Sequence, residues 1–189
     1  MKDKKLKYEN ITISGKIGVG STTLSASLRE TLQWKYINAG QLQREFDRQN
    51  NINEHLHGAL SRTDEHEREM ENMAVQTLQN EKYIIYEAWL SGFIARDMVH
   101  VLKVLLMCTN DAVRIDRVVN RENIDVITAK QYIKQREEEN IKKWKNLYGD
   151  FDFWSPAYYD LVIDTYASGP METAGKVLDK LGYHNGRKT

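Results

Sequence analysis

The sequence predicts an α/β fold, a doubly wound and mostly parallel five-stranded sheet flanked by helices. Two observations predict it. Short apolar runs rich in branched residues alternate with helical patterns of about ten residues or more, the length that a crossover between parallel strands needs. The chain of 189 residues is also long enough to bury one sizeable core. We therefore expect residues 1–189 to form a single domain that binds ligands beyond the carboxyl ends of its strands.

Five runs have the length and composition of buried parallel strands. They are residues 10–14 (NITIS), 35–38 (KYIN), 83–87 (YIIYE), 101–108 (VLKVLLMC) and 160–164 (DLVID). Helical patterns lie between them, at residues 21–33, 40–49, 64–80, 110–122, 129–147 and 169–182. In the first of these, Leu24, Leu28 and Leu32 fall on one helical stripe, which is typical of a helix packed on a sheet.

The charge balance argues against a polyanionic partner. Lys and Arg together number 27, as do Asp and Glu, so no net field favours nucleic acid or a membrane surface. No segment approaches the roughly 20 apolar residues of a membrane span, and the N-terminus lacks the apolar stretch of a secretory signal. The single cysteine, Cys108, excludes an intrachain disulfide. We expect a cytoplasmic protein without nucleic-acid or membrane partners.

Residues 14–23, SGKIGVGSTT, follow the first expected strand and precede the first helix, as a phosphate-binding loop does. The usual pattern ends in Gly-Lys-Ser/Thr, where the lysine contacts the outer phosphates and the hydroxyl reaches Mg²⁺. Here Ser21 stands where the lysine is expected, and Thr22 keeps the metal position. The candidate nucleotide-binding residues are Gly15, Lys16, Gly18, Gly20, Ser21, Thr22 and Thr23. A glycine-rich turn without a ligand is the structural alternative.

Loss of the loop lysine removes a fixed charge from the place where phosphoryl transfer needs it. A loss of ~3 kcal/mol would slow the chemistry on the order of a hundredfold. Lys16 offers a replacement, since its position is similar to that of the signature lysine in ParA and MinD-like ATPases. It can reach phosphates in its own chain, reach them across a dimer, or stay solvated.

Six segments in order resemble the archaeal-type cytidylate kinase family and, more broadly, the nucleoside monophosphate kinases. They are ITISGKIGVGSTT, KYINAGQLQRE, YEAWLSGF, VRIDRVVNRE, QREEENIKKWKNLYG and YYDLVIDT, and the resemblance runs in order over roughly residues 8–182. The resemblance implies a P-loop kinase fold that uses ATP and Mg²⁺ and transfers the γ-phosphoryl group to a nucleoside monophosphate, CMP or dCMP before others. It also implies an acceptor-binding helical insert near residues 40–80 and a lid near 114–148. We expect a monomer or a homodimer.

The resemblance assigns roles residue by residue. Arg44 is the candidate contact to the acceptor phosphate, and Gln41 stands where the family has Asp. Glu87 joins Thr22 as a candidate for the Mg²⁺ site, because a carboxylate suits that ion. Trp89 replaces an expected arginine and either stacks on the acceptor base or fills the core. The alternatives for Arg44 and Glu87 are a solvated arginine and a plain carboxylate at a strand end.

The expected lid is rich in arginine. Arg114, Arg117 and Arg121 recur at intervals of three and four and share one helix face, and Arg136 lies on the next helix. The catalytic candidates are Lys16, Arg117, Arg121 and Arg136, because a closing lid brings arginines onto the transferring group. Nearby acids support the alternative of a salt-bridged, exposed face.

Two further readings stay open. Ser21 and Trp89 each remove a cation, which favours a nucleotide-binding protein with impaired transfer that acts through a partner. Gln41 and Trp89 favour a kinase for another small metabolite. His55, His57 and His66 match no zinc spacing and are expected at the surface. The aromatic residues between Trp144 and Tyr159 are expected to pack the second lid helix onto the body or to form a subunit contact.

Overall fold

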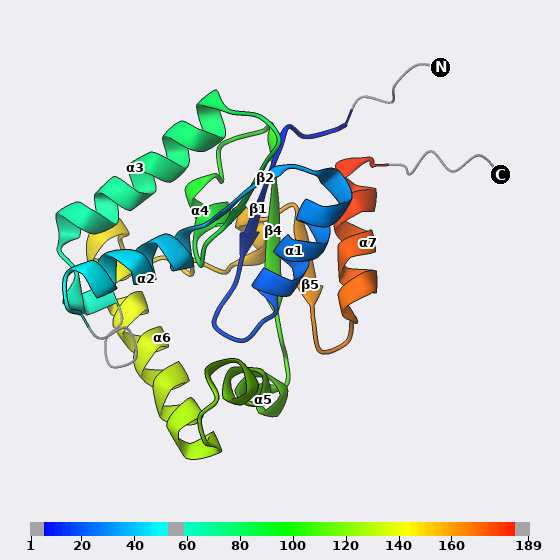
Figure 1. The fold of residues 1–189 in the computed structure, drawn as a ribbon. Coiled ribbons are helices and arrows are strands. Elements are labelled where there is room, and N and C mark those ends of the chain that lie inside the picture. Colours follow the sequence, from blue (N-terminus) through cyan, green and yellow to red (C-terminus); the bar gives the residue numbers. More distant parts are fainter. Residues whose placement is uncertain (1–5, 53–58, 184–189) are drawn as a thin grey trace, which may run out of the picture.

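The computed structural model describes residues 6–52 and 59–183, and its centre is a sheet of five strands (Figure 1). The strands are β1 (Asn10–Ser14), β2 (Lys35–Asn38), β3 (Ile84–Glu87), β4 (Val101–Met107) and β5 (Leu161–Asp164). Their order is β2-β3-β1-β4-β5, and each neighbouring pair is parallel. The predicted fold class is therefore confirmed. All five strands end at the same edge of the sheet, where the loops that follow them come together.

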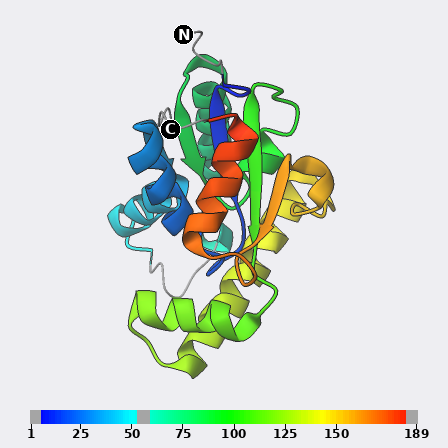
Figure 2. The same cartoon turned by 90° about the vertical axis from the view of Figure 1, so that its right-hand side faces the viewer.

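Helices cover both faces of the sheet (Figures 1 and 2). They are α1 (Ser21–Leu32), α2 (Ala39–Gln49), α3 (Asp64–Asn80), α4 (Ser91–Ile94), α5 (Asp111–Glu122), α6 (Val126–Tyr148) and α7 (Pro170–Leu181), with 3-10 turns at Ala59–Ser61 and Pro156–Tyr158. The helices α1 and α7 pack together on one face, while α3 and α4 lie on the other. None of the helices in the described residues is long and apolar enough to cross a membrane.

Successive side chains of β1 point to opposite faces of the sheet, and the two faces have different partners. Ile11 and Ile13 are fully buried and join the core formed with α1 and α7. Asn10, on the opposite face, is also fully buried. Its amide donates to the carbonyls of Leu78 (3.0 Å) and Glu81 (2.8 Å), so it ties the end of α3 to the sheet. A buried amide with partners of this kind is satisfied and costs little stability.

The helices α5 and α6 stand beyond the carboxyl edge of the sheet (Figure 1). Asp125 caps α6, because its Oδ1 accepts hydrogen bonds from the backbone N–H groups of Ile127 (2.8 Å) and Thr128 (3.0 Å). This cap explains why the helix begins at Val126 and not at residue 129, as its apolar pattern predicted.

The second half of α6 is anchored to the segment that contains α2 and α3. Asn140 Oδ1 accepts a hydrogen bond of 2.7 Å from the backbone N–H of Ala59, and Lys143 Nζ donates to Arg62 O at 2.8 Å. The Arg62 guanidinium is buried and contacts Glu67 at 2.7 Å and Asp47 at 3.3 Å. Removing one member of such a buried ionic group leaves a charge without compensation, so this group fixes the segment that α6 contacts.

The aromatic residues before β5 pack α6 onto the body of the protein. The ring of Trp144 lies 5.7 Å from that of Trp89, 6.3 Å from Phe153 and 6.2 Å from Trp154. Phe153 is fully buried. Of the two predicted roles for this cluster, the structure shows the packing of the second helix.

Candidate active site

The connection from β1 to α1 is a tight turn that needs glycine at specific places. Gly18 has φ of 77°, in the left-handed region, and a Cβ added to it would lie 2.8 Å from the carbonyl oxygen of Arg114. A Cβ on Gly15 would lie 2.6 Å from Leu106 O. The turn leads into the N-terminus of α1, whose first backbone N–H groups have no partners within the helix. Such a turn can receive an anion at close range.

The hydroxyl groups at the start of α1 converge on one carboxylate. Ser21 Oγ donates to Glu87 Oε1 at 2.8 Å, and Thr22 Oγ1 donates to the same oxygen at 2.9 Å. Glu87 ends β3, next to β1, so the pairing of adjacent strands brings the predicted carboxylate to the loop. Ser21, which stands at the position of the missing lysine, is therefore hydrogen-bonded to Glu87.

Two residues of β2 hold the second oxygen of Glu87. Tyr36 donates its hydroxyl hydrogen bond to Glu87 Oε2, and Asn38 Nδ2 donates to that oxygen at 3.3 Å. Burial raises the pKa of the Tyr36 hydroxyl, and the hydrogen bond to Glu87 and the charge of that carboxylate raise it further. The sequence analysis did not identify Tyr36 or Asn38. They are two residues apart at the carboxyl end of a predicted strand, so their side chains share one face of it, and this pattern could have identified them.

Lys16 points away from the turn and toward α6. Its Nζ lies 3.8 Å from Glu137 Oε2 and 5.0 Å from the centroid of the Trp154 ring. Arg114 also contacts Glu137 through one guanidinium nitrogen, and its Nε donates to Ile17 O at 3.1 Å. One carboxylate on α6 thus faces the loop lysine and an arginine that braces the loop.

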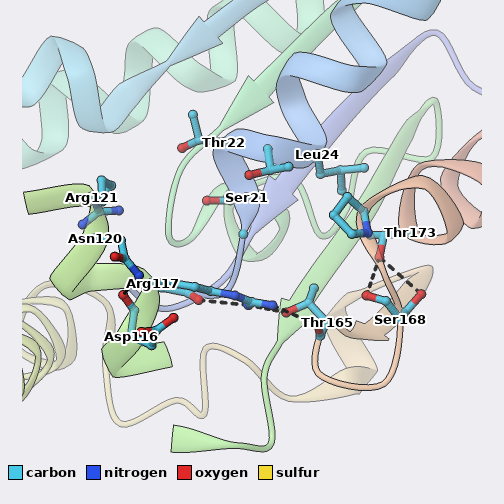
Figure 3. A pocket seen from close by; sticks show the side chains of 14 residues that line it. Ser21, Thr22, Leu24, Asp116, Arg117, Asn120, Arg121, Thr165, Ser168 and Thr173 are labelled. Carbon is cyan, nitrogen blue, oxygen red and sulfur yellow. Dashed lines mark hydrogen bonds between the residues drawn. The ribbon is translucent and has the colours of Figure 1, made fainter. Parts of the chain in front are cut away.

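Arg117 connects the loop with the segment after β5, as Figure 3 shows. Its NH1 donates to Gly18 O at 3.1 Å and to Thr165 Oγ1 at 2.9 Å, and its NH2 donates to Thr165 O at 3.0 Å. The Thr165 hydroxyl in turn lies 2.9 Å from Val19 O. The arginine therefore holds the shape of the turn besides presenting a charge to it.

Two cavities open on opposite sides of the loop and share Gly18, Ser21, Thr22 and Arg121 in their walls. The first, of about 480 Å³, also includes Gly20, Thr23, Leu24, Asp116, Arg117, Asn120, Thr165, Ser168, Pro170 and Thr173 (Figure 3). The second, of about 430 Å³, includes Gly15, Lys16, Tyr36, Asn38, Gln41, Arg44, Glu87, Trp89, Tyr132 and Arg136. The structure thus brings the sequence-predicted residues to one loop with a cavity on either side.

A smaller cavity of about 110 Å³ adjoins the second one, with Trp89 and Arg136 in the walls of both. Tyr86 lines it from β3, and its hydroxyl has no hydrogen-bond partner among the residues that the structure describes. Burial raises the pKa of Tyr86 to about 12, so this hydroxyl stays protonated at neutral pH.

Comparison with known proteins identifies the family. The sequence model of the cytidylate kinase-like family matches residues 10–167. The chain belongs to the cytidylate kinase-like family. Its relatives include the cytidylate kinase of Pyrococcus abyssi, 33% identical over 164 residues that cover 85% of this chain and 86% of that protein. The cytidylate kinase of Thermoplasma acidophilum is 28% identical over 176 residues, which cover 90% and 91% of the two chains.

Solved structures agree on the fold of this cytidylate kinase-like protein. A gluconokinase from Sinorhizobium meliloti 1021 aligns with a TM-score of 0.60 at 12% identity and covers 94% of each chain. A shikimate kinase from Acinetobacter baumannii aligns with a TM-score of 0.55 at 15% identity, over 91% of this chain and 92% of that one. The fold is that of P-loop kinases. Family membership makes the protein a kinase-like enzyme of the nucleoside monophosphate kinase type, a class that uses ATP and Mg²⁺.

His66 lines neither of the two cavities beside the loop. His66 is half-buried on α3, stacks on Phe46 with 3.6 Å between ring centroids, and contacts Gln43. His55 and His57 fall outside the described residues. Within the described part of the chain, no three side chains of His, Cys, Asp or Glu gather as metal ligands.

Proposed function

We propose that this protein transfers the γ-phosphoryl group of ATP to a nucleoside monophosphate, with CMP or dCMP as the acceptor. The observation that carries the proposal is the pair of cavities that meet at one phosphate-binding turn. A kinase with two nucleotide substrates needs such a pair, because the two phosphates must meet in line at the transferring group. The family and its curated relatives, which are named cytidylate kinases, support the choice of acceptor.

On the donor side, ATP would occupy the 480 Å³ cavity, with its phosphates against the turn at residues 15–22. The backbone N–H groups there and the positive end of the α1 dipole favour a polyanion. Thr22 and Glu87 supply hydroxyl and carboxylate oxygens, the hard ligands that Mg²⁺ prefers, so this pair fits the ion. When bound, Mg²⁺ neutralises charge on the phosphates.

On the acceptor side, the monophosphate would occupy the 430 Å³ cavity. Arg44 would bind its phosphate, while Gln41 and Trp89 would contact the nucleoside. This role makes residues 40–80 the acceptor-binding insert. Residues 114–148 would act as a lid that brings Arg121 and Arg136 to the transferring group.

The chemistry needs no protein nucleophile. A non-bridging oxygen of the acceptor phosphate attacks the γ-phosphorus of ATP, and the bond from that phosphorus to the β–γ bridging oxygen breaks to release ADP. The chain positions both nucleotides, excludes water and neutralises charge. The positive charge at the transferring group would come from Lys16, Arg117, Arg121 and Arg136.

The test is ADP formation from ATP·Mg²⁺ with CMP, dCMP, UMP, AMP and GMP, each in turn. We expect the highest kcat/KM with CMP or dCMP. A catalytically impaired nucleotide-binding protein is the second candidate, because Ser21 bonds to Glu87 and Lys16 faces a carboxylate. Tight ATP binding without turnover on any acceptor would favour that candidate. Turnover only with a hydroxylated metabolite would favour the third candidate, a kinase for another small metabolite.

A further inference from the structure

Lys16 is the only lysine or arginine in residues 14–23, and its ammonium group faces α6. Its neighbours are Glu137 on α6, at 3.8 Å, and the ring of Trp154, at 5.0 Å. The lysine side chain is 38% exposed. An ion pair of this length and exposure is weak, because water screens it and the lysine keeps much of its rotamer freedom. Lys16 can therefore leave Glu137 at little cost.

Glu137 is held more firmly than Lys16. Its side chain is 16% exposed, and its carboxylate contacts the guanidinium group of Arg114, whose side chain is 12% exposed. Arg114 keeps two further contacts, to Ile17 O at 3.1 Å and to Asp111 at 3.3 Å. Glu137 thus stays in place whether or not Lys16 is bound to it.

The position of Glu137 depends on the acceptor side of the molecule. Asn140, less than one helical turn further along α6, accepts the backbone N–H of Ala59, and Lys143 donates to Arg62 O. Both of these residues are buried. The carboxylate that faces the phosphate loop is therefore carried by a helix anchored to the proposed acceptor insert.

We propose that Glu137 is a positioning residue that holds Lys16 while the site is free of nucleotide and yields it to the phosphates when ATP binds. The inference rests on the proposed function, since it requires ATP at the turn. The triphosphate carries more negative charge than one carboxylate that Arg114 already neutralises, so it attracts the ammonium group more strongly. Competition of this kind lowers the affinity for ATP and couples the donor loop to α6.

A purely structural role for Glu137 predicts the opposite sign. If this carboxylate only braces Arg114 and the loop, then Glu137→Gln loosens the turn and weakens ATP binding. If it competes with ATP for Lys16, the same change frees the lysine and tightens binding. The isosteric amide removes the charge and leaves the shape of the side chain almost unchanged.

The experiment is the dissociation constant of ATP·Mg²⁺, measured by calorimetry for the full-length chain. We expect Glu137→Gln to tighten ATP binding by the wild-type protein about threefold, which is the size of a weak ion pair. In the Lys16→Met background, the same substitution should tighten ATP binding by less than about 1.5-fold. Glu138→Gln is the matched control, because Glu138 is the next residue on α6 and its exposed pair with Lys134 spans 3.9 Å. This control should leave the constant unchanged.

A second measurement does not depend on the folding of the Glu137 variant. Because Lys16 lies over Trp154, its departure should change the tryptophan fluorescence when ATP·Mg²⁺ is added to the wild-type protein, and Trp154→Phe and Lys16→Met should each remove that change. The inference alone would be overturned if Glu137→Gln left ATP binding unchanged or weakened it, or if the substitution had the same effect in the Lys16→Met background. A fluorescence change that persists in Lys16→Met would also overturn it. A wild-type protein that binds no ATP would overturn the proposed function as well.

Discussion

Ser21 Oγ lies 2.8 Å from Glu87 Oε1 and donates a hydrogen bond to it, at the place where a phosphate-binding loop ordinarily has its lysine. The same oxygen accepts from Thr22 at 2.9 Å, while Tyr36 and Asn38 donate to the other oxygen. The carboxylate is thus satisfied by neutral donors and needs no cation from the loop. The charge that phosphoryl transfer needs must come from elsewhere in the site, and Lys16 is the candidate nearest in sequence.

Lys16→Met should lower kcat with CMP by about 10- to 100-fold, because it removes the one loop cation from the site. Ser21→Lys, made in the Lys16→Met background, should restore part of that loss by returning an ammonium group at the usual position. The measurement is steady-state ADP formation by each variant. An unchanged kcat in Lys16→Met would show that Lys16 stays solvated during turnover.

Glu87→Gln should abolish most of the turnover, by about 100-fold or more, and raise the Mg²⁺ concentration that supports half-maximal activity. The new amide would direct donor hydrogens at Ser21, Thr22, Tyr36 or Asn38, which all donate now, so some stability should be lost too. A magnesium titration of activity and a thermal melt separate the two effects. An unchanged magnesium requirement would exclude Glu87 from the metal site.

Thr165→Val should raise the KM for ATP several-fold and leave the KM for CMP unchanged. The hydroxyl of Thr165 accepts from Arg117 and contacts Val19 O, and Thr165 lines the proposed donor cavity but not the acceptor cavity. Each lost hydrogen bond is worth about 1 kcal/mol, or roughly fivefold in affinity. Thr109→Val, which removes a hydroxyl that bonds to Asp164, is the matched control. Equal effects on both substrates would contradict a role confined to the donor side.

The stability of the protein should fall as the pH drops below about 6.5. Burial lowers the pKa of His66 below its usual value, so the unfolded chain takes up a proton there more readily than the folded chain does. The stability that neutral His66 contributes is therefore complete above the unfolded pKa and is lost as the pH falls through the folded one.

His66→Phe tests this prediction, since it keeps an aromatic ring on Phe46 and removes the titration. We expect the melting temperature of the wild type to fall more steeply between pH 7 and 5 than that of the variant, because the other histidines are common to both. Parallel pH profiles would mean that His66 titrates as it does in the unfolded chain.

The sequence predicted the sheet well, because composition and turn residues mark buried parallel strands. The expected bounds of β1 and β2 match the structure, and β3 begins at Ile84, one residue later than predicted. Tyr83 has φ of 63°, a left-handed conformation, so the regular strand begins only after this residue. The helix α4 (Ser91–Ile94) was missed, because four residues are too few to show a period.

The site was predictable where a motif or a strand end marks it, and not where tertiary packing makes it. The glycine turn, Thr22 and Glu87 follow from the order of strand, loop and strand. The sequence placed Glu137 only among the acids of a salt-bridged, exposed helix face, since it is the first of three consecutive glutamates on a polar helix. Only the crossing of α5 and α6 beside the loop brings its carboxylate to Arg114 and Lys16.

A crystal structure with Mg²⁺, CMP and a non-hydrolysable ATP analogue tests the central claim most directly. We predict the β-phosphate within the turn at residues 15–22, the metal ion beside Thr22 and Glu87, and CMP in the cavity lined by Gln41 and Arg44. An empty or collapsed turn, with nucleotide bound elsewhere or not at all, would contradict the account.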